Sequence, residues 1–195
     1  LLHMEIVQER LEREYGIDLV LTTPSVVFQV VTHGNKVTEV HRPNDMPSPS
    51  TILSIAEPFV KAVILCPAEA VGGMMDLAIQ KRGVYVSTEY LSETRVKLVY
   101  EMPLAEILID FYDKLKSLTR GYGSFDYELI GYRPAQLVRL DILLNLKICE
   151  PLSTIVAKAQ AYEKGKALVE KLKEIIPRQL FEVAIQAAVG SHIIA

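Results

Sequence analysis

The order of apolar patterns between residues 57 and 135 constrains the fold of this chain more than any other feature. A continuous apolar run is typical of a central strand, an apolar residue at every third or fourth position indicates a helix, and strict alternation indicates a half-buried strand. In order, the segments are a strand at 60–66, a helix at 68–82, strands at 84–91 and 95–102, a helix at 104–120 and a strand at 124–132. This β-α-β-β-α-β order predicts a ferredoxin-like domain.

Both predicted helices have their ends marked in the sequence. In the second, Leu104, Leu108, Phe111, Leu115 and Leu118 follow one another at alternating steps of four and three, which predicts a single amphipathic helix over 104–120. Gly83 follows the first helix and Gly121 follows the second. Glycine is common just after a helix because it accepts positive φ without strain, so we expect both helices to end there.

The residues before this domain predict part of another one. Residues 1–15 carry a helical apolar stripe that ends at Gly16, and SVVFQVV at 25–31 is typical of a strand. One helix and one or two strands cannot cover each other's apolar faces, so residues 1–56 are expected to be the end of an α/β domain plus a linker. Turn-forming residues, three prolines among them, predict that 32–56 is an irregular connection.

The residues after the ferredoxin-like domain predict a second α+β unit. A strand or hairpin is expected at 137–149, a long helix at about 153–176, and a returning strand at 181–190. The resulting fold class is α+β, with domains at 1–56, 57–135 and 136–195. Because the chain starts inside a helix and stops in the apolar run HIIA, we interpret it as a piece of a longer protein whose first and last units are incomplete.

Charge and hydropathy narrow the function classes. The net charge of −3 argues against a general nucleic-acid binder, but residues 1–56 hold 4 basic and 7 acidic groups, 57–135 hold 9 and 11, and 136–195 hold 8 and 6. A contact with a polyanion is therefore expected to be local and toward the C-terminal half. No apolar run approaches the roughly 18 residues that cross a bilayer, so no membrane association is predicted.

No motif for catalysis, a cofactor or a metal is found. A glycine-rich loop ending in Lys-Ser/Thr, which nucleotide hydrolysis would require, is missing, and Asn35-Lys36-Val37-Thr38 lacks the carboxylate that reads guanine in GTPases. The four histidines have no metal-ligand spacing with one another or with a cysteine. We therefore predict no catalytic, cofactor-binding or metal-binding residue and no small-molecule substrate for this chain.

Basic and aromatic residues leave two RNA-related hypotheses open. Cations gather at the two helix ends, with Lys81 and Arg82 at the end of the first helix and Lys114, Lys116 and Arg120 at the end of the second, where the helix dipole alone could explain them. RGYGSFDY at 120–127 resembles the aromatic signature of RRM domains, but it is one residue too long and follows the second helix instead of preceding it. A ligand-binding regulatory module of the ACT type, which has the same element order, is the non-RNA alternative.

Longer stretches of the chain resemble translational GTPases of the elongation factor G class. Residues 1–30 resemble the end of their domain III, and 57–83 with 93–135 resemble their domain V. More specific stretches resemble the LepA (elongation factor 4) family and the start of its C-terminal domain, namely SFDYE, GYRP, VRLDILLN and the run from Tyr162 to the end. The resemblance covers essentially the whole chain and depends on long runs in matching order.

The resemblance implies a ribosome-dependent GTPase, bacterial or organellar and cytoplasmic, which is proposed to promote back-translocation of tRNAs under stress. GTP and magnesium belong to domains outside this chain. The family's domain V faces large-subunit rRNA, and its C-terminal domain reaches toward tRNA. The positions that this implies as rRNA contacts are Lys81, Arg82, Lys114, Lys116 and Arg120, and those implied for tRNA or rRNA are Lys158, Lys164, Lys166 and Arg178.

One departure from the family bears on these positions. The family commonly has a His-Arg pair near the start of its long helix, where this chain reads VAKAQAYEKG. A basic contact there is expected to be weaker, with Lys158 as the remaining cation. We expect the chain to act as a monomeric arm that binds the ribosome.

Overall fold

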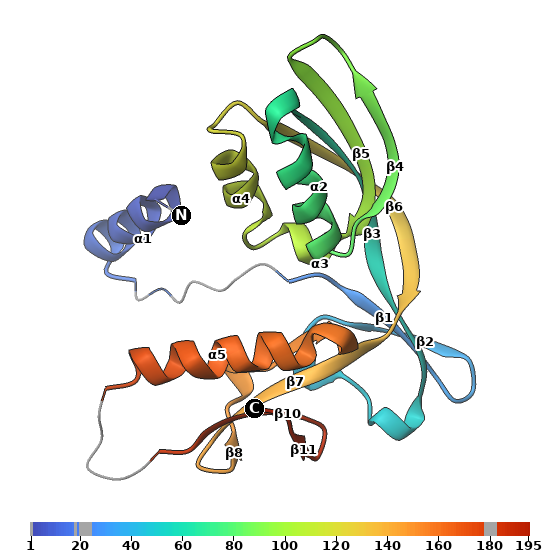
Figure 1. Ribbon diagram of the computed structural model, residues 1–195. Helices are drawn as coiled ribbons and strands as arrows, with labels where there is room; N and C mark the ends of the chain where they lie inside the picture. Colours follow the sequence, from blue (N-terminus) through green and yellow to red (C-terminus); the bar gives the residue numbers. More distant parts are fainter. Residues whose placement is uncertain (1, 18, 20–24, 178–182) are drawn as a thin grey trace.

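The larger part of the molecule is built around a six-stranded antiparallel sheet. The computed structural model describes residues 2–17, 19, 25–177 and 183–195 (Figure 1). The strands of this sheet are β1 (Phe28–Thr32), β2 (Lys36–Val40), β3 (Ile52–Pro67), β4 (Val84–Tyr90), β5 (Arg95–Pro103) and β6 (Ser124–Ala135). Their order is β2-β1-β3-β5-β4, and β6 pairs with the other edge of β3. Strand β3 is therefore the one strand that joins all parts of the sheet.

The ferredoxin-like domain is confirmed. Strands β6, β3, β5 and β4 lie in that order, and the helices α2 (Val71–Gln80), α3 (Leu104–Ile107) and α4 (Phe111–Leu118) cover one face of them (Figure 1). Alternate residues of β3 and β5 point toward these helices and are fully buried, among them Ile64, Leu98 and Met102. They pack against Met74 of α2 and residues of α4, so the predicted strand and helix faces meet in one core.

The prediction of one helix over 104–120 was wrong. The chain forms a short helix, α3, then turns at 108–110 and begins α4 at Phe111. The apolar stripe divides at this turn, because Phe111 and Leu115 enter the ferredoxin-like core while Leu108 packs against a different one. The spacing indicated one buried face, but two cores share that face, and the chain turns between α3 and α4.

The prediction that 32–56 is irregular was wrong for two of its segments. Strands β1 and β2 form a hairpin whose turn contains Gly34 and Asn35, both with positive φ. Strand β3 begins at Ile52 and runs without interruption past residue 57, so it crosses the predicted domain boundary. Helix α1 (Leu2–Tyr15) agrees with the prediction, and Gly16, at a φ of +62°, donates its backbone N–H to the Glu12 carbonyl.

The C-terminal residues form a second antiparallel sheet covered by one helix. Its strands are β7 (Leu137–Leu144), β8 (Lys147–Ile148), β9 (Thr154–Ala157), β10 (Ile185–Val189) and β11 (His192–Ile193). Their order is β11-β10-β7-β8, and β9 pairs with residues 137–140 of β7, on the edge opposite β10. Helix α5 (Ala161–Ile175) lies across this sheet (Figure 1), close enough that a Cβ on Gly165 would meet the Ala187 Cβ at 2.9 Å.

The predicted start of the long helix at about residue 153 was wrong. Residues 154–157 instead pair with β7 as β9, and helix α5 begins at Ala161. Thr154, Ile155 and Val156 are β-branched, and such side chains favour strands over helices. The hairpin predicted at 137–149 and the returning strand are both found as β7–β8 and β10.

The second apolar core, against which Leu108 packs, joins the two sheets. Val30 and Val40 of the N-terminal hairpin and Ile55 of β3 pack together with Leu137 of β7 and Ala157 of β9. Leu104, Ala105 and Leu108, from α3 and the turn that follows it, pack against the same cluster. The C-terminal unit is therefore seated against the ferredoxin-like domain through buried and partly buried apolar side chains.

Candidate nucleic-acid interface

Helices α2 and α4 end in the same backbone motif. After α2, Gly83 donates its N–H to the Ala78 carbonyl at 2.7 Å, and Arg82 donates to the Ile79 carbonyl. After α4, Gly121 donates to the Lys116 carbonyl at 2.7 Å, and Arg120 donates to the Ser117 carbonyl. This pair of bonds is the Schellman motif, which satisfies carbonyls left open at a helix end.

The left-handed residue in both motifs is an arginine. Arg82 has a φ of 58° and Arg120 a φ of 50°. The sequence predicted positive φ for the glycine after each helix. Gly121 does have a positive φ, of 87°, directly after Arg120, whereas Gly83 only follows the left-handed Arg82. Gly83 is needed for close approach, since a Cβ there would lie 2.7 Å from the Ala78 carbonyl oxygen.

The side chain of Arg82 is enclosed by acidic residues. It donates to both oxygens of the Glu57 carboxylate, at 2.6 and 2.9 Å, and to Glu106 at 3.2 Å. The Glu57 side chain is only 1% exposed and that of Glu106 only 6%. Burial by itself would lower the pKa of Arg82, but the hydrogen bonds and charges of Glu57 and Glu106 outweigh it and raise that pKa. Arg82 is thus held inside the fold as a permanent cation.

Lys81 and Lys114 meet at a third carboxylate. Lys81 and Lys114 both form ion pairs with Asp110, and the Lys114 distance is 2.8 Å. Partial burial by itself would raise the pKa of Asp110, but hydrogen bonds from Lys114 and Lys81 dominate and lower it. Because Lys114 is half exposed, it can still face a ligand outside the protein, whereas Lys81 is largely covered.

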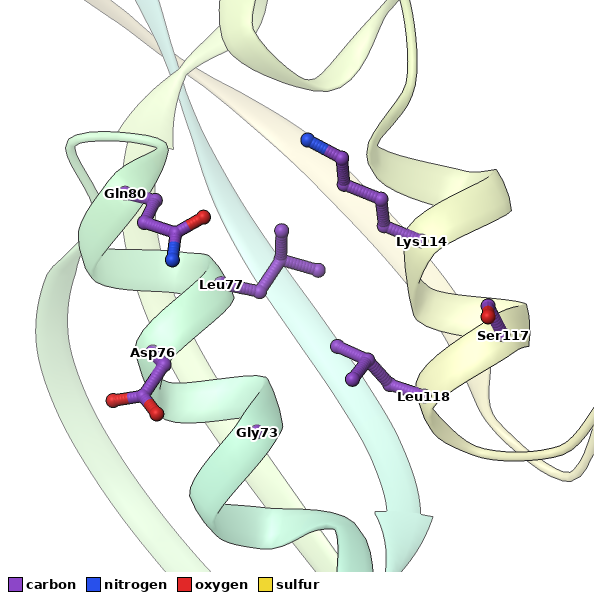
Figure 2. Close-up of a pocket in the computed structure, with 7 residues that line it drawn as sticks. All are labelled: Gly73, Asp76, Leu77, Gln80, Lys114, Ser117 and Leu118. Carbon is purple, nitrogen blue, oxygen red and sulfur yellow. The ribbon is translucent and has the colours of Figure 1, made fainter.

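A groove separates α2 from α4 beside this ion pair. It has a volume of about 360 Å³ and is lined by Gly73, Asp76, Leu77, Gln80, Lys114, Ser117 and Leu118. Figure 2 shows Leu77 and Leu118 pointing toward each other across it. The lining mixes acidic, basic and apolar groups and offers no concentration of one charge.

Side-chain hydrogen bonds hold the backbone of the loop after α4, and its two largest side chains are exposed. The Thr119 hydroxyl donates to the Leu115 carbonyl and accepts the Gly123 N–H, both at 2.8 Å. Lys116 Nζ donates to the Gly121 and Gly123 carbonyls, at 3.3 and 2.8 Å. Within the described part of the chain, the exposed side chains of Arg120 and Tyr122 form no hydrogen bond or ion pair, and Tyr122 is 74% exposed.

The ammonium group of Lys116 therefore binds carbonyl groups of its own loop. Its ammonium group also lies 5.3 Å from the centre of the Tyr112 ring. Of the three cations predicted at this helix end, Lys116 stabilises the loop and Arg120 is presented to solvent, whereas Lys114 lies nearer the start of α4, where it pairs with Asp110.

The predicted contacts on the C-terminal unit differ from one another as well. Lys164 on α5 forms a 3.0 Å ion pair with Glu106 of α3. Lys158, just before α5, and Lys166, on it, are exposed and form no ion pair among the described residues. Arg178 lies outside the described residues.

Five of the predicted cations lie at two separate ends of the α2–α4 helix pair. Helices α2 and α4 lie with opposite ends together, because Lys81 at the end of α2 reaches Asp110 at the start of α4, while Gly73 near the start of α2 lies against Leu118. Lys81, Arg82, Lys114 and Lys164 are brought together at one end of this helix pair. Arg120 lies at the other end.

Sequence reasoning missed the acidic members of this arrangement. Glu57 and Glu106 are buried carboxylates that hold Arg82 and Lys164. Glu106 stands among apolar residues in Leu104–Ile107, and a carboxylate within such a run is a signal of a buried ion pair. Glu57, immediately before the apolar strand run, carries the same signal.

The RRM-like hypothesis is not supported by the geometry. RRM aromatics stack on bases from the sheet face that is free of helices. Phe125 instead packs against Phe111 of α4, with ring centres 4.9 Å apart, on the helix-covered face. Phe125 of that stretch therefore serves core packing.

No metal-binding cluster accompanies these charges. Across residues 2–17, 19, 25–177 and 183–195, no three His, Cys, Asp or Glu side chains are placed to hold an ion. In the same part of the chain, no helix is long and apolar enough to cross a membrane.

Comparison with known proteins identifies the family. Residues 54–143 match the family "Elongation factor G C-terminus", and residues 144–195 match "GTP-binding protein LepA C-terminus". Over all 195 residues, the chain is 54% identical to elongation factor 4 of Halalkalibacterium halodurans and 56% identical to that of Streptococcus equi subsp. zooepidemicus. The chain belongs to the elongation factor 4 family. It is a C-terminal segment of such a translation factor.

The segment spans about a third of its relatives. It covers 32% of the length of both proteins and 32% of elongation factor 4 from Bacillus cereus strain Q1, to which it is 54% identical. A solved chain from Thermus thermophilus aligns with 42% of this chain and 12% of its own length, at 29% identity and a TM-score of 0.40. The family assignment replaces the ACT-type alternative, since both matched families are translation-factor C-termini.

Proposed function

We propose that this chain is the ribosome-contacting arm of a ribosome-dependent GTPase and binds large-subunit rRNA through the exposed loop after α4. GTP and magnesium would be bound by the remainder of the factor, which lies outside this chain. Residues 1–56 would complete a domain III-like unit, 57–135 would be the domain V-like unit, and 136–195 would begin the family's own C-terminal domain.

The observation that supports the proposal most is the rigid loop at 119–123. Four side-chain hydrogen bonds fix its backbone, yet the side chains of Arg120 and Tyr122 are left in solvent. A guanidinium group can bind a phosphate with two parallel hydrogen bonds, and an aromatic ring can stack on an unpaired base. A preorganised loop loses little conformational entropy when it makes such contacts.

The other predicted contacts differ in whether their side chains are exposed or held by partners within the chain. Lys114, Lys158 and Lys166 are exposed and support the proposal as secondary phosphate contacts, with tRNA as an additional candidate for Lys158 and Lys166. Arg82 and Lys81 are held by carboxylates and are largely covered, so we propose structural roles for them. The same structural role fits Lys116.

The remaining expectations are also part of the proposal. A factor that acts on bacterial ribosomes would work in the cytoplasm, and the chain would act there as a monomer. The relatives named above are bacterial, which favours the bacterial over the organellar option. Back-translocation of tRNA is the step we propose for the intact factor.

The test is co-sedimentation of the 195-residue chain with 70S ribosomes and with isolated 50S subunits over a salt series. Saturable binding to the 50S subunit that weakens with salt is expected. Arg120→Glu should weaken it and make the logarithmic salt slope shallower by about 1, as expected for one lost phosphate contact. In the intact factor, the same change should lower ribosome-stimulated GTP hydrolysis.

Lys171→Glu is the matched control, because it makes the same charge change at another exposed position, on α5. If both variants bind the 50S subunit equally well, the loop is not the contact. If the wild-type chain fails to bind at low salt, the affinity belongs to other domains of the factor.

A further inference from the structure

A buried charge cluster spans the joint between the two units. Glu106 of α3 accepts a hydrogen bond from Arg82 at 3.2 Å and one from Lys164 of α5 at 3.0 Å. Arg82 is anchored in turn by two bonds to Glu57 of β3. Four elements far apart in the sequence are thereby connected in one chain of charges, from β3 through the α2–β4 turn and α3 to α5.

The cluster coincides with a second polar link between the same units. The Gln160 side chain, just before α5, donates its amide N–H to the Gln80 carbonyl at the end of α2, at 3.1 Å. Below these links lies the apolar core formed by Leu104, Leu108 and Ala157, among others. The joint therefore has an apolar centre with directional polar contacts at its edge.

We propose that Glu106, shared by Arg82 and Lys164, is a positioning residue that fixes the angle of α5 on the ferredoxin-like domain. Burial of apolar surface stabilises contact but has no preferred direction, so the apolar core alone permits α5 to rock on α3. A buried carboxylate is different, because it must keep charged donors at hydrogen-bonding distance or be left uncompensated. Glu106 meets that requirement only while Lys164 stays over it.

The charge count explains why Lys164 is required. Arg82 carries one positive charge, and Glu57 and Glu106 carry two negative charges between them. The Arg82 Nη1 and Nη2 groups each donate to an oxygen of Glu57, and Glu106 receives one hydrogen bond, from Nε–H. Lys164 supplies the second cation and makes the cluster neutral.

The effect of this arrangement on RNA binding rests on the proposed function, but the role of Glu106 in positioning α5 does not. Helix α5 carries Lys166, and Lys158 lies just before it. With α5 fixed by Glu106, these cations keep a constant relation to Arg120 on the ferredoxin-like domain. A rigid spacing between separate phosphate contacts suits a structured RNA, whose phosphates also have fixed spacing.

The test measures the distance between the two units directly. Spin labels are attached to cysteines placed at two exposed positions, Glu93 in the β4–β5 turn and Lys171 on α5, in a Cys149→Ser background. Cys66 is fully buried and should not react. The distribution of label distances is then compared among the parent, Lys164→Met, Glu106→Gln and a control, Lys166→Met.

A narrow distribution is expected for the parent and the control, and a broader or shifted one for Lys164→Met and Glu106→Gln. The distance distribution of the double variant should be no broader than the broader of the two single-variant distributions, because both substitutions break the same contact between Glu106 and Lys164. Unchanged distributions in both single variants would overturn the proposal. Lys164 is 39% exposed on a surface helix, so Lys164→Met keeps the test available if Glu106→Gln fails to fold.

Co-sedimentation with 50S subunits separates this claim from the proposed function. Broadened distances with normal ribosome binding would leave the positioning role intact and show that fixed spacing is not needed for binding. Unchanged distances with weakened binding would make Lys164 an RNA contact and reject Glu106 as a positioning residue.

Discussion

The two helix ends at Lys81-Arg82-Gly83 and Thr119-Arg120-Gly121 are alike in sequence and backbone but opposite in use. In both, an arginine in the left-handed region ends the helix and a glycine follows. Arg82 faces into the molecule and binds two buried carboxylates, whereas Arg120 extends into solvent. The backbone motif fixes where each arginine starts, and tertiary neighbours decide what it binds.

The two arginines therefore differ in what compensates for their left-handed backbone. Left-handed backbone costs a residue with a Cβ roughly 1–2 kcal/mol, and glycine avoids most of that cost. At Arg82 the cost is offset by the ion pairs with Glu57 and Glu106. At Arg120 no side-chain hydrogen bond or ion pair within the described residues offsets it, which fits the proposed contact of this arginine with RNA.

The largest expected difference is in stability. Arg82→Met would leave Glu57 and Glu106 with one cation between them, and removing one partner of a buried ion pair costs about 3–5 kcal/mol. Arg120→Met removes no internal contact, so we expect a change within about 0.5 kcal/mol. Urea denaturation of both variants measures this. Equal losses would show that the two helix ends are not distinct.

The sequence predicted the ferredoxin-like domain because each of its elements has its own periodicity. It did not predict the break at 108–110 or the start of β3 at Ile52, because both depend on a core shared with β7 and β9. A stripe such as Leu104 to Leu118 shows which face is buried but not how many cores bury it. Residues 154–157 were misassigned for a related reason, since their strand exists through pairing with β7.

The candidate site was predictable only in part. The cations at the helix ends could be found from the sequence, and so could Arg120 in its glycine-flanked loop. The sorting of these cations into free and internally bound ones could not, because Glu57 and Glu106 lie 25 and 24 positions from Arg82. Ion pairs at such separation are set by strand order and helix position, which no local pattern shows.

Alanine at two glycines tests whether the two ends are equally rigid. A Cβ on Gly83 would lie 2.7 Å from the Ala78 carbonyl oxygen, and one on Gly123 would lie 2.6 Å from Thr119 Oγ1. Each substitution overpacks a tight site and should cost about 1–3 kcal/mol. Gly123→Ala should additionally weaken 50S binding, because it displaces the loop that presents Arg120. Wild-type 50S binding by Gly123→Ala would mean that loop rigidity does not matter.

Arg120→Gly tests whether the arginine at this position serves 50S binding and not stability. Glycine relieves the left-handed strain at φ 50°, but it also gains more freedom in the unfolded chain, so we expect a net stabilisation of about 0.5–1 kcal/mol. The same variant should lose 50S affinity. The equivalent Arg82→Gly should instead be strongly destabilised. A stabilised Arg120→Gly with normal affinity would remove the functional reason for an arginine at this position.

The smallest expected effect is the loss of folding stability at low pH when Asp110, which links the end of α2 to α4, is protonated. Its pKa is lowered in the folded state from an ordinary 3.8, because the opposing effect of partial burial is outweighed by Lys114 and Lys81. A group with a depressed folded pKa contributes stability above its unfolded pKa and loses it as the pH falls through the folded value. Stability from this carboxylate is therefore complete above about pH 4 and declines below it.

Asp110→Asn should accordingly lower stability slightly at neutral pH and flatten the decline between about pH 4 and 2, with the two proteins converging at the acid end of a urea-denaturation series. Asp113→Asn, an exposed carboxylate on the same helix without an ion pair among the described residues, is the control. Parallel acid profiles for the parent and Asp110→Asn would show that Lys81 and Lys114 do not stabilise this helix end through Asp110, and would leave Arg82 as the cation that fixes it.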